Sequence, residues 1–136
     1  MSNVAIVYWS GTGNTEAMAN AIAEGAKGAG AKVDMFTAAE FDASKVNDYS
    51  AIAFGCPSMG AEQLEDMEFE PMWDGVKNEL NSVKVFLFGS YGWGDGEWMR
   101  TWESNAPCNV VETYICNETP GEAEVAACQE LGAKMA

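Results

Sequence analysis

Short runs of apolar residues recur along the chain, and their spacing predicts its secondary structure. Five runs rich in β-branched or aromatic residues predict strands at 4–9, 31–37, 51–55, 83–89 and 110–115. The clearest helical spacing follows residues 13–16, and its apolar stripe is formed by Ala17, Met18, Ala21, Ile22 and Gly25. Weaker helical segments are expected at 72–81, 98–104 and 122–134. The alternation reads βαβαβαβαβ.

The first, third and fourth predicted strands are almost continuously apolar. This is the pattern of strands that helices cover on both faces of a parallel sheet. We therefore expect a doubly wound α/β fold in which residues 1–136 form a single domain. In such sheets, ligands bind beyond the carboxyl ends of the strands, where the strand order reverses. The loops after Trp9, Gly55 and Gly89 are therefore the candidate binding loops.

Composition and charge narrow the classes of function. The chain has 7 basic and 21 acidic residues and a net charge of −14, which disfavours nucleic acid and anionic lipid as partners. No run reaches the roughly 18 apolar residues of a membrane span, and no basic leader is visible, so we expect a cytoplasmic protein. Four dispersed cysteines without any histidine offer no zinc or cysteine-nucleophile pattern.

The loop from Ser10 to Thr15, with the sequence SGTGNT, lies between the first strand and the clearest helix. A helix start offers unpaired N–H groups and a partial positive charge to an anion. Gly11 and Gly13 allow a tight turn and a close approach of the backbone to a ligand. Side-chain donors come from Ser10, Thr12, Asn14 and Thr15. Because the loop has no lysine or arginine, it suits a protein that retains a phosphate-bearing ligand.

Two other phosphate-binding patterns do not fit this loop. A P-loop needs a lysine after its glycines, and none follows here. The dinucleotide fingerprint needs a glycine where Glu16 stands, and that acid would oppose a pyrophosphate. A turn that only caps the helix is the remaining alternative.

The run from Tyr8 to Thr15, YWSGTGNT, resembles the phosphate loop of flavodoxins, and the resemblance extends over the whole chain. It implies a flavodoxin-like three-layer sandwich, with a five-stranded parallel sheet in the order 2-1-3-4-5 and helices on both faces. It also implies FMN as the cofactor and a low-potential one-electron carrier that shuttles electrons between redox enzymes. Since no insertion splits the fifth run, the resemblance is to the short-chain class.

The loop at 55–62, GCPSMGAE, follows the third strand. Met59 has a polarizable side chain that can lie against an aromatic ring. In the family, the matching methionine packs on the inner face of the flavin, the residue matching Glu62 accepts a bond from flavin N3–H, and the peptide matching 60–61 flips on reduction. Pro57 stands where some relatives have a serine that reaches the phosphate. The resemblance thus assigns flavin contacts to Ser58, Met59, Gly60, Ala61 and Glu62.

The loop at 89–96, GSYGWGDG, follows the fourth strand and places two aromatic residues among four glycines. A tryptophan between glycines can lie flat on a ring, and stacking adds about 1 kcal/mol. In the family, the tryptophan at the place of Trp93 covers the outer flavin face; a protein-contact anchor is the alternative. Contacts are assigned here to Ser90, Tyr91, Gly92, Trp93 and Gly94. Asn117, after the fifth strand, aligns with an asparagine near the flavin in relatives.

Acidic residues surround the expected position of the ring and oppose the addition of a second electron. Two well-separated one-electron steps are therefore expected, the lower one strongly reducing. The acids concerned are Glu62, Glu65, Asp66, Glu68 and Asp95. The same charge favours basic-surfaced redox proteins as electron donors and acceptors of a monomeric carrier.

Three enzymatic or signalling alternatives fit the sequence less well. A flavin-dependent reductase on the same fold needs a substrate pocket over the ring face that Trp93 is expected to cover. A receiver domain needs an aspartate after the third strand, where Gly55 and Cys56 stand. A low-molecular-weight tyrosine phosphatase needs an arginine six residues after a loop cysteine, but the residue six positions after Cys56 is Glu62. With no nucleophile or general base assigned, we expect electron transfer and no enzymatic reaction.

Overall fold

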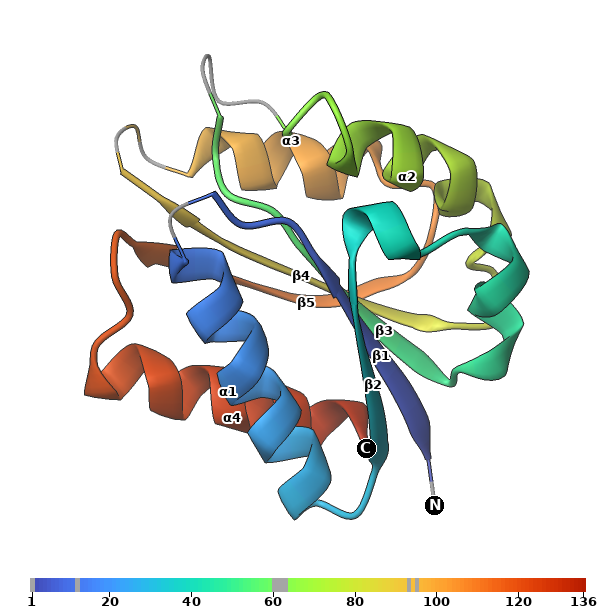
Figure 1. Ribbon diagram of the computed structural model, residues 1–136, viewed down its shortest axis with the longest axis horizontal. Helices are drawn as coiled ribbons and strands as arrows, with labels where there is room; N and C mark the ends of the chain where they lie inside the picture. The colour runs from blue at the N-terminus through green and yellow to red at the C-terminus, as the bar shows by residue number, and fades with distance from the viewer. Residues whose placement is uncertain (1, 12, 60–63, 93, 95) are drawn as a thin grey trace.

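The computed structural model describes residues 2–11, 13–59, 64–92, 94 and 96–136, which form a three-layer α/β arrangement (Figure 1). The strands are β1 (Asn3–Tyr8), β2 (Lys32–Thr37), β3 (Ala51–Gly55), β4 (Lys84–Tyr91) and β5 (Val110–Asn117). The helices are α1 (Asn14–Gly28), α2 (Phe69–Val76), α3 (Glu97–Asn105) and α4 (Glu122–Met135). All neighbouring strands are parallel, in the order β2-β1-β3-β4-β5, so the predicted fold and strand order are confirmed.

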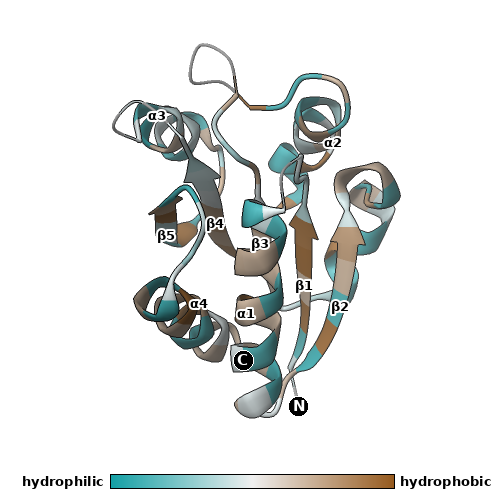
Figure 2. Cartoon of the chain, turned by 60° about the vertical axis from the view of Figure 1, so that its left-hand side comes forward, coloured by the Kyte–Doolittle hydropathy of each residue, from teal (hydrophilic) through white to brown (hydrophobic). Residues whose placement is uncertain are grey.

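The burial of the strands follows their place in the sheet. Every residue of β3 and the inner residues of β1 and β4 are buried, whereas the edge strands β2 and β5 are mostly half-buried. Figure 1 shows α1 and α4 on one face of the sheet and α2 and α3 on the other. In Figure 2 the apolar colour runs along most of β1, while β2 and the helices mix apolar and hydrophilic residues. Central strands are covered twice, which explains their continuous apolar runs.

Helix α1 begins where Gly13 adopts a left-handed conformation, with φ 95°. Three positions of its predicted stripe, Met18, Ala21 and Ile22, are buried against the sheet. Helix α4 packs so closely on α1 that a Cβ atom on Gly132 would collide with the backbone carbonyl of Ile22. This close approach of two backbones requires glycine in α4.

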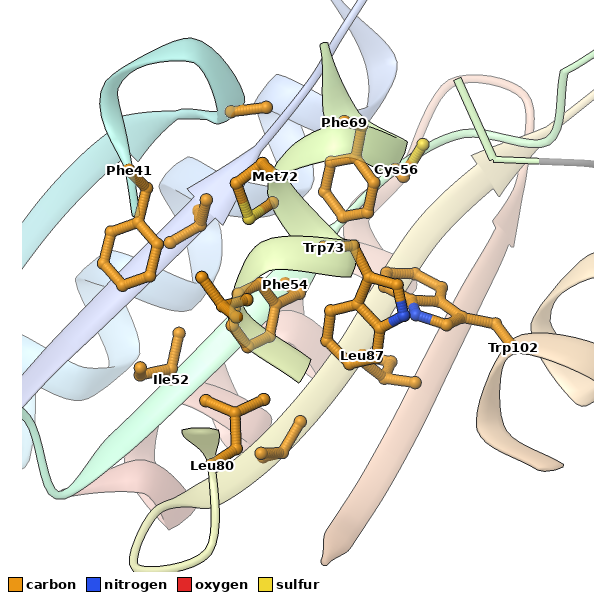
Figure 3. Packing of buried hydrophobic residues seen from close by; sticks show 14 of the residues in the cluster. Phe41, Ile52, Phe54, Cys56, Phe69, Met72, Trp73, Leu80, Leu87 and Trp102 are labelled. Atoms are coloured by element: carbon orange, nitrogen blue, oxygen red, sulfur yellow. The ribbon is translucent and has the colours of Figure 1, made fainter. Parts of the chain in front are cut away.

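The other face of the sheet is covered by an aromatic cluster (Figure 3). The rings of Phe54 and Trp73 lie 5.1 Å apart, and those of Trp73 and Trp102 lie 5.5 Å apart at 88°. Edge-to-face contacts of this kind stabilise a pair by about 1 kcal/mol beyond the burial of area. The cluster fixes α2 and α3 on the strands whose ends carry the candidate loops.

The structure corrects the alternation at the connection between β2 and β3. The pattern βαβαβαβαβ places an α-helix there, but the chain forms the 3-10 helices Ala38–Glu40 and Ala43–Asp48. Local capping explains the difference: the Glu40 carboxylate accepts the N–H of Thr37, and the Asp42 side chain accepts the N–H of Ser44. Such side-chain bonds compete with a continuous helix.

The bounds of two strands and one helix also differ from the prediction. Strands β4 and β5 extend beyond 89 and 115, because their pairing continues to Tyr91 opposite Asn117. Helix α2 begins at Phe69, earlier than expected, and ends in a 3-10 turn, Lys77–Glu79. Among the described residues, no helix has the length and apolar character needed to cross a membrane.

Candidate cofactor site

A cavity of about 440 Å³ opens at the carboxyl ends of the central strands. Its volume is within the range of small-molecule and cofactor sites. The walls come from the loops that follow β1, β3, β4 and β5. The lining residues are Trp9, Ser10, Gly11, Asn14, Thr15, Pro57, Ser58, Met59, Ser90, Tyr91, Gly92, Glu118 and Thr119. The cavity therefore lies where the strand order predicted a ligand.

The side chain of Ser10 binds backbone N–H groups at the start of α1. The hydroxyl oxygen of Ser10 accepts the N–H of Gly13 at 3.0 Å and the N–H of Glu16 at 3.3 Å. These are N–H groups at a helix start, which have no partner within the helix. Ser10 itself lines the cavity, and with its oxygen occupied by these two N–H groups its hydroxyl hydrogen remains to donate to a ligand.

Thr15 and Ser90 tie the first and third loops together. The hydroxyl groups of Thr15 and Ser90 lie 3.2 Å apart, and the N–H of Ser90 donates to the Thr15 hydroxyl at 3.4 Å. Thr15 is only 1% exposed. The N–H of Ser58 donates to the Ser90 carbonyl at 3.0 Å, so the loop after β3 joins the same network. Three loops that are distant in sequence therefore form one wall.

Ser58 carries a buried hydroxyl that has no hydrogen-bond partner within the described residues. A buried polar group left unpaired costs about 1–3 kcal/mol, so such groups are rare in native proteins. Pro57, the residue before it, supplies neither an N–H nor a side-chain donor. Since Thr15, Ser58 and Ser90 line the same cavity, an unpaired hydroxyl on Ser58 fits a ligand with an anionic, oxygen-rich end, as the phosphate and ribityl chain of FMN provide.

Trp9, Tyr91 and Met59 line the cavity, and Trp98 packs behind Tyr91. The rings of Tyr91 and Trp98 lie 5.5 Å apart, and the Trp98 indole N–H donates to the Cys56 carbonyl at 3.3 Å. The Trp9 indole N–H donates to the Glu68 carboxylate at 3.0 Å. These contacts hold apolar ring surface next to the polar end of the cavity, an arrangement suited to a ligand with an aromatic part and a charged part.

The loop after β5 contributes residues that the sequence did not indicate. Glu118 and Thr119 line the cavity, whereas Asn117 is the exposed last residue of β5 and does not. Glu118 has φ 58°, and its N–H donates to the Tyr91 carbonyl at 2.7 Å. The Thr119 hydroxyl donates to the Asn14 side chain at 3.1 Å. Because β5 runs two residues further than expected, the residues after Asn117 reach the cavity.

The predicted contact residues fall into three groups. The structure brings to the cavity Ser10, Gly11, Asn14, Thr15, Ser58, Met59, Ser90, Tyr91 and Gly92. Gly13 lines an adjoining hollow, and neither Gly94 nor Asn117 is in the lining. Five predicted residues lie outside the described residues: Thr12, Gly60, Ala61, Glu62 and Trp93. Trp9 was missed because it reads as the last residue of a buried strand.

The charges around the cavity are acidic. Asp66, Glu68 and Glu118 are exposed, whereas Glu65, expected at the acidic rim, is 5% exposed. Burial raises the pKa of the Glu65 carboxyl, but the hydrogen bonds from the N–H groups of Phe69, Glu68 and Met67 lower it by more. The pKa of Glu65 is therefore below its ordinary value. Among the described residues, no group of three or more metal-ligating side chains could hold a metal ion.

Comparisons with known proteins agree with this geometry. The family model described as flavodoxin matches residues 6–106. The flavodoxin of Megasphaera elsdenii is 47% identical over 132 residues, 95% of each chain. That of Clostridium beijerinckii is 44% identical over 135 residues, 96% of this chain and 97% of the relative. The solution structure of two-electron reduced M. elsdenii flavodoxin superposes with a TM-score of 0.87 at 45% identity, over 96% of this chain and 98% of that one.

The two relatives and the solved structure match nearly the whole chain, and the cavity of this chain lies where the strand order predicts. The chain therefore belongs to the flavodoxin family, as an FMN-bound, low-potential electron carrier of the short-chain class that catalyses no substrate reaction.

Proposed function

We propose that this chain holds the phosphate end of FMN between the loop at 10–15 and the hydroxyl groups of Thr15, Ser58 and Ser90. The unpaired, buried hydroxyl of Ser58 carries this proposal, because none of the residues that the structure describes supplies an acceptor for it. The Ser10 hydroxyl lines the same cavity, and because its oxygen already accepts the N–H groups of Gly13 and Glu16, its own hydrogen is left to donate to the ligand. Charge-assisted bonds to a phosphate are about twice as strong as neutral ones.

The flavin ring would lie in the wider part of the cavity, against Met59, Tyr91 and Gly92. When bound, FMN supplies the one-electron redox chemistry. The residues of this chain orient it and keep one edge open for electron transfer. The family resemblance adds the proposed contacts of Thr12, Gly60, Ala61, Glu62 and Trp93, with Gly13, Gly94 and Asn117 as flanking positions.

The experiment that tests the phosphate site compares two flavins that differ only in the phosphate. The FMN-free protein is titrated with FMN and with riboflavin, and flavin fluorescence is followed. Two charge-assisted hydrogen bonds correspond to at least about 100-fold tighter binding of FMN. Thr15→Val removes a hydroxyl at nearly constant volume. It should weaken the binding of FMN but leave the affinity for riboflavin almost unchanged. Equal affinities of the wild-type protein for both flavins would refute the phosphate site.

The redox partners that we propose are basic-surfaced proteins that meet a monomeric, single-domain carrier in the cytoplasm. The net charge of −14 supports this choice, as do the exposed acids Glu118, which lines the cavity, and Glu68, which bonds the cavity residue Trp9. Opposite charges accelerate encounter, and salt screens them. Electron transfer from the reduced protein to cytochrome c, a basic protein, should slow with salt, while transfer to anionic ferricyanide should accelerate. Rates that ignore salt would contradict charge steering.

A further inference from the structure

Glu65 is the one charged side chain that is buried in the described part of the chain. Its carboxylate accepts the backbone N–H groups of Met67, Glu68 and Phe69, each at 2.8 Å. Two of these donors meet Oε1 and the third meets Oε2. The three bonds replace the hydration that the carboxylate loses on burial.

The backbone of Glu65 joins the same side chain to the end of β3. Its N–H donates to the thiol sulfur of Cys56 at 3.3 Å, and its carbonyl accepts the N–H of Glu70 at 2.9 Å. Cys56 is fully buried and directly follows β3. Cys56 and Glu65, which flank the segment 57–64, are therefore bonded to each other, and Glu65 is bonded to the first turn of α2.

This segment carries Ser58 and Met59 into the cofactor cavity. The Glu65 carboxylate also fixes the backbone of Glu68, whose own carboxylate accepts the Trp9 indole N–H at 3.0 Å. Trp9 lines the cavity from the loop after β1. Glu65 is thus bonded to two segments that support the cavity, although Glu65 itself does not line the cavity.

We propose that Glu65 is a positioning residue for the flavin: its hydrogen bonds hold the base of the segment 57–64 and the Trp9 wall before FMN binds. This inference rests on the proposed function, in which that segment contacts the ring. A loop that is ordered in advance does not lose conformational freedom on binding. The affinity for FMN and the two one-electron potentials therefore depend on the geometry of this carboxylate as well as on its charge.

A matched pair of variants separates geometry from charge. Glu65→Gln and Glu70→Gln each remove one negative charge from the same part of the chain, but Glu70 is exposed and uses only its backbone in the network. A glutamine at position 65 presents one oxygen and one NH₂ group. It can keep at most the pair of bonds at one oxygen, and the remaining N–H then faces a donor.

The experiment measures the dissociation constant of FMN, the separation between the two one-electron potentials, and amide hydrogen exchange at 67–69 in the FMN-bound proteins. Relative to Glu70→Gln, Glu65→Gln should raise the dissociation constant of FMN about tenfold, the equivalent of one charge-assisted hydrogen bond. It should also narrow the separation between the two one-electron potentials. Exchange at 67–69 should accelerate only in Glu65→Gln. Equal affinities and equal separations in the two variants would overturn the positioning role.

Glu65→Asp provides a second test if Glu65→Gln does not fold. It keeps the charge but withdraws the carboxylate by one methylene, so any change in potential comes from geometry. We expect an effect of the same sign as that of Glu65→Gln but smaller, and an unchanged dissociation constant and separation would refute the inference. The wild-type preference for FMN over riboflavin reports on the proposed phosphate site independently of these variants.

Discussion

The substitution Ser58→Ala should change the stability of the FMN-free protein and its affinity for FMN in opposite directions. In the absence of the cofactor, the Ser58 hydroxyl is buried without a partner among the described residues. Replacing it by a hydrogen atom removes that penalty and little volume, so the FMN-free variant should be about 1 kcal/mol more stable than the wild type. For a domain of this size, this corresponds to an increase of about 4 °C in Tm.

The same change removes a donor to the phosphate end of FMN. A hydrogen bond to a charged group contributes about 1.5–3 kcal/mol, so the dissociation constant should rise about 10- to 150-fold. Urea unfolding of the FMN-free protein, followed by circular dichroism, measures the first effect. Titration with FMN, followed by flavin fluorescence, measures the second.

Ser82→Ala is the matched control, because Ser82 is exposed in the turn before β4, at the opposite end of that strand from Ser90. It should leave the FMN affinity unchanged. Two results would refute the reasoning about Ser58. One is an FMN-free Ser58→Ala protein that is less stable than the wild type. The other is a dissociation constant equal to that of the wild type.

Three further predictions concern packing, backbone strain and thiol chemistry. Gly132→Ala should destabilise the protein to urea by at least about 1–3 kcal/mol, because the added Cβ meets the backbone of α1. Glu118→Gly should stabilise the FMN-free protein by about 0.5–1 kcal/mol in the same assay, since it relieves a left-handed residue with φ 58°. Burial raises the pKa of Cys56 and of Cys128 to about 12, so both stay protonated at pH 8. Iodoacetamide should therefore modify the half-buried Cys108 first, as peptide mapping would detect.

Each of these predictions has an internal comparison. Gly75→Ala, where a Cβ meets nothing within 4 Å, should be neutral or stabilising, and equal stability of the Gly75 and Gly132 variants would contradict tight packing of α1 on α4. Glu118→Ala removes the carboxylate but keeps the strained backbone, so only the glycine variant should gain stability. In urea all four cysteines should react, and early modification of Cys128 in the native protein would disprove its protection.

Burial on both faces of the sheet made the central part of the fold predictable from the sequence. Continuous apolar runs mark β1, β3 and β4, and the glycine-rich loop after β1 marks the start of α1. Edges and connections were less predictable, since they depend on pairing and capping. The capping bonds of Glu40 and Asp42 favour 3-10 helices where an α-helix was expected. The pairing of Tyr91 with Asn117 lengthens β4 and β5.

Part of the candidate site depends on contacts that one-dimensional patterns do not contain. The sequence indicates that Ser58 is near the ligand, but not that its hydroxyl lacks a partner. Glu65 resembles any surface acid until the backbone of the next four residues turns its N–H groups towards it. Glu118 enters the cavity only because β5 is longer than its apolar run.

The bonds that tie Thr15, Ser58 and Ser90 together also bear on folding and turnover of the protein. Thr15 and Ser58 follow β1 and β3, and Ser90 lies near the end of β4, so their wall exists only after the parallel sheet has assembled. Sheets of such distant pairings form slowly. A ligand that needs the complete wall binds the native chain alone and shifts the folding equilibrium by mass action. At a free FMN concentration 100 times the dissociation constant, this shift is about 2.7 kcal/mol. Scarcity of FMN would therefore raise the unfolded fraction of this protein, which is the form that proteases attack.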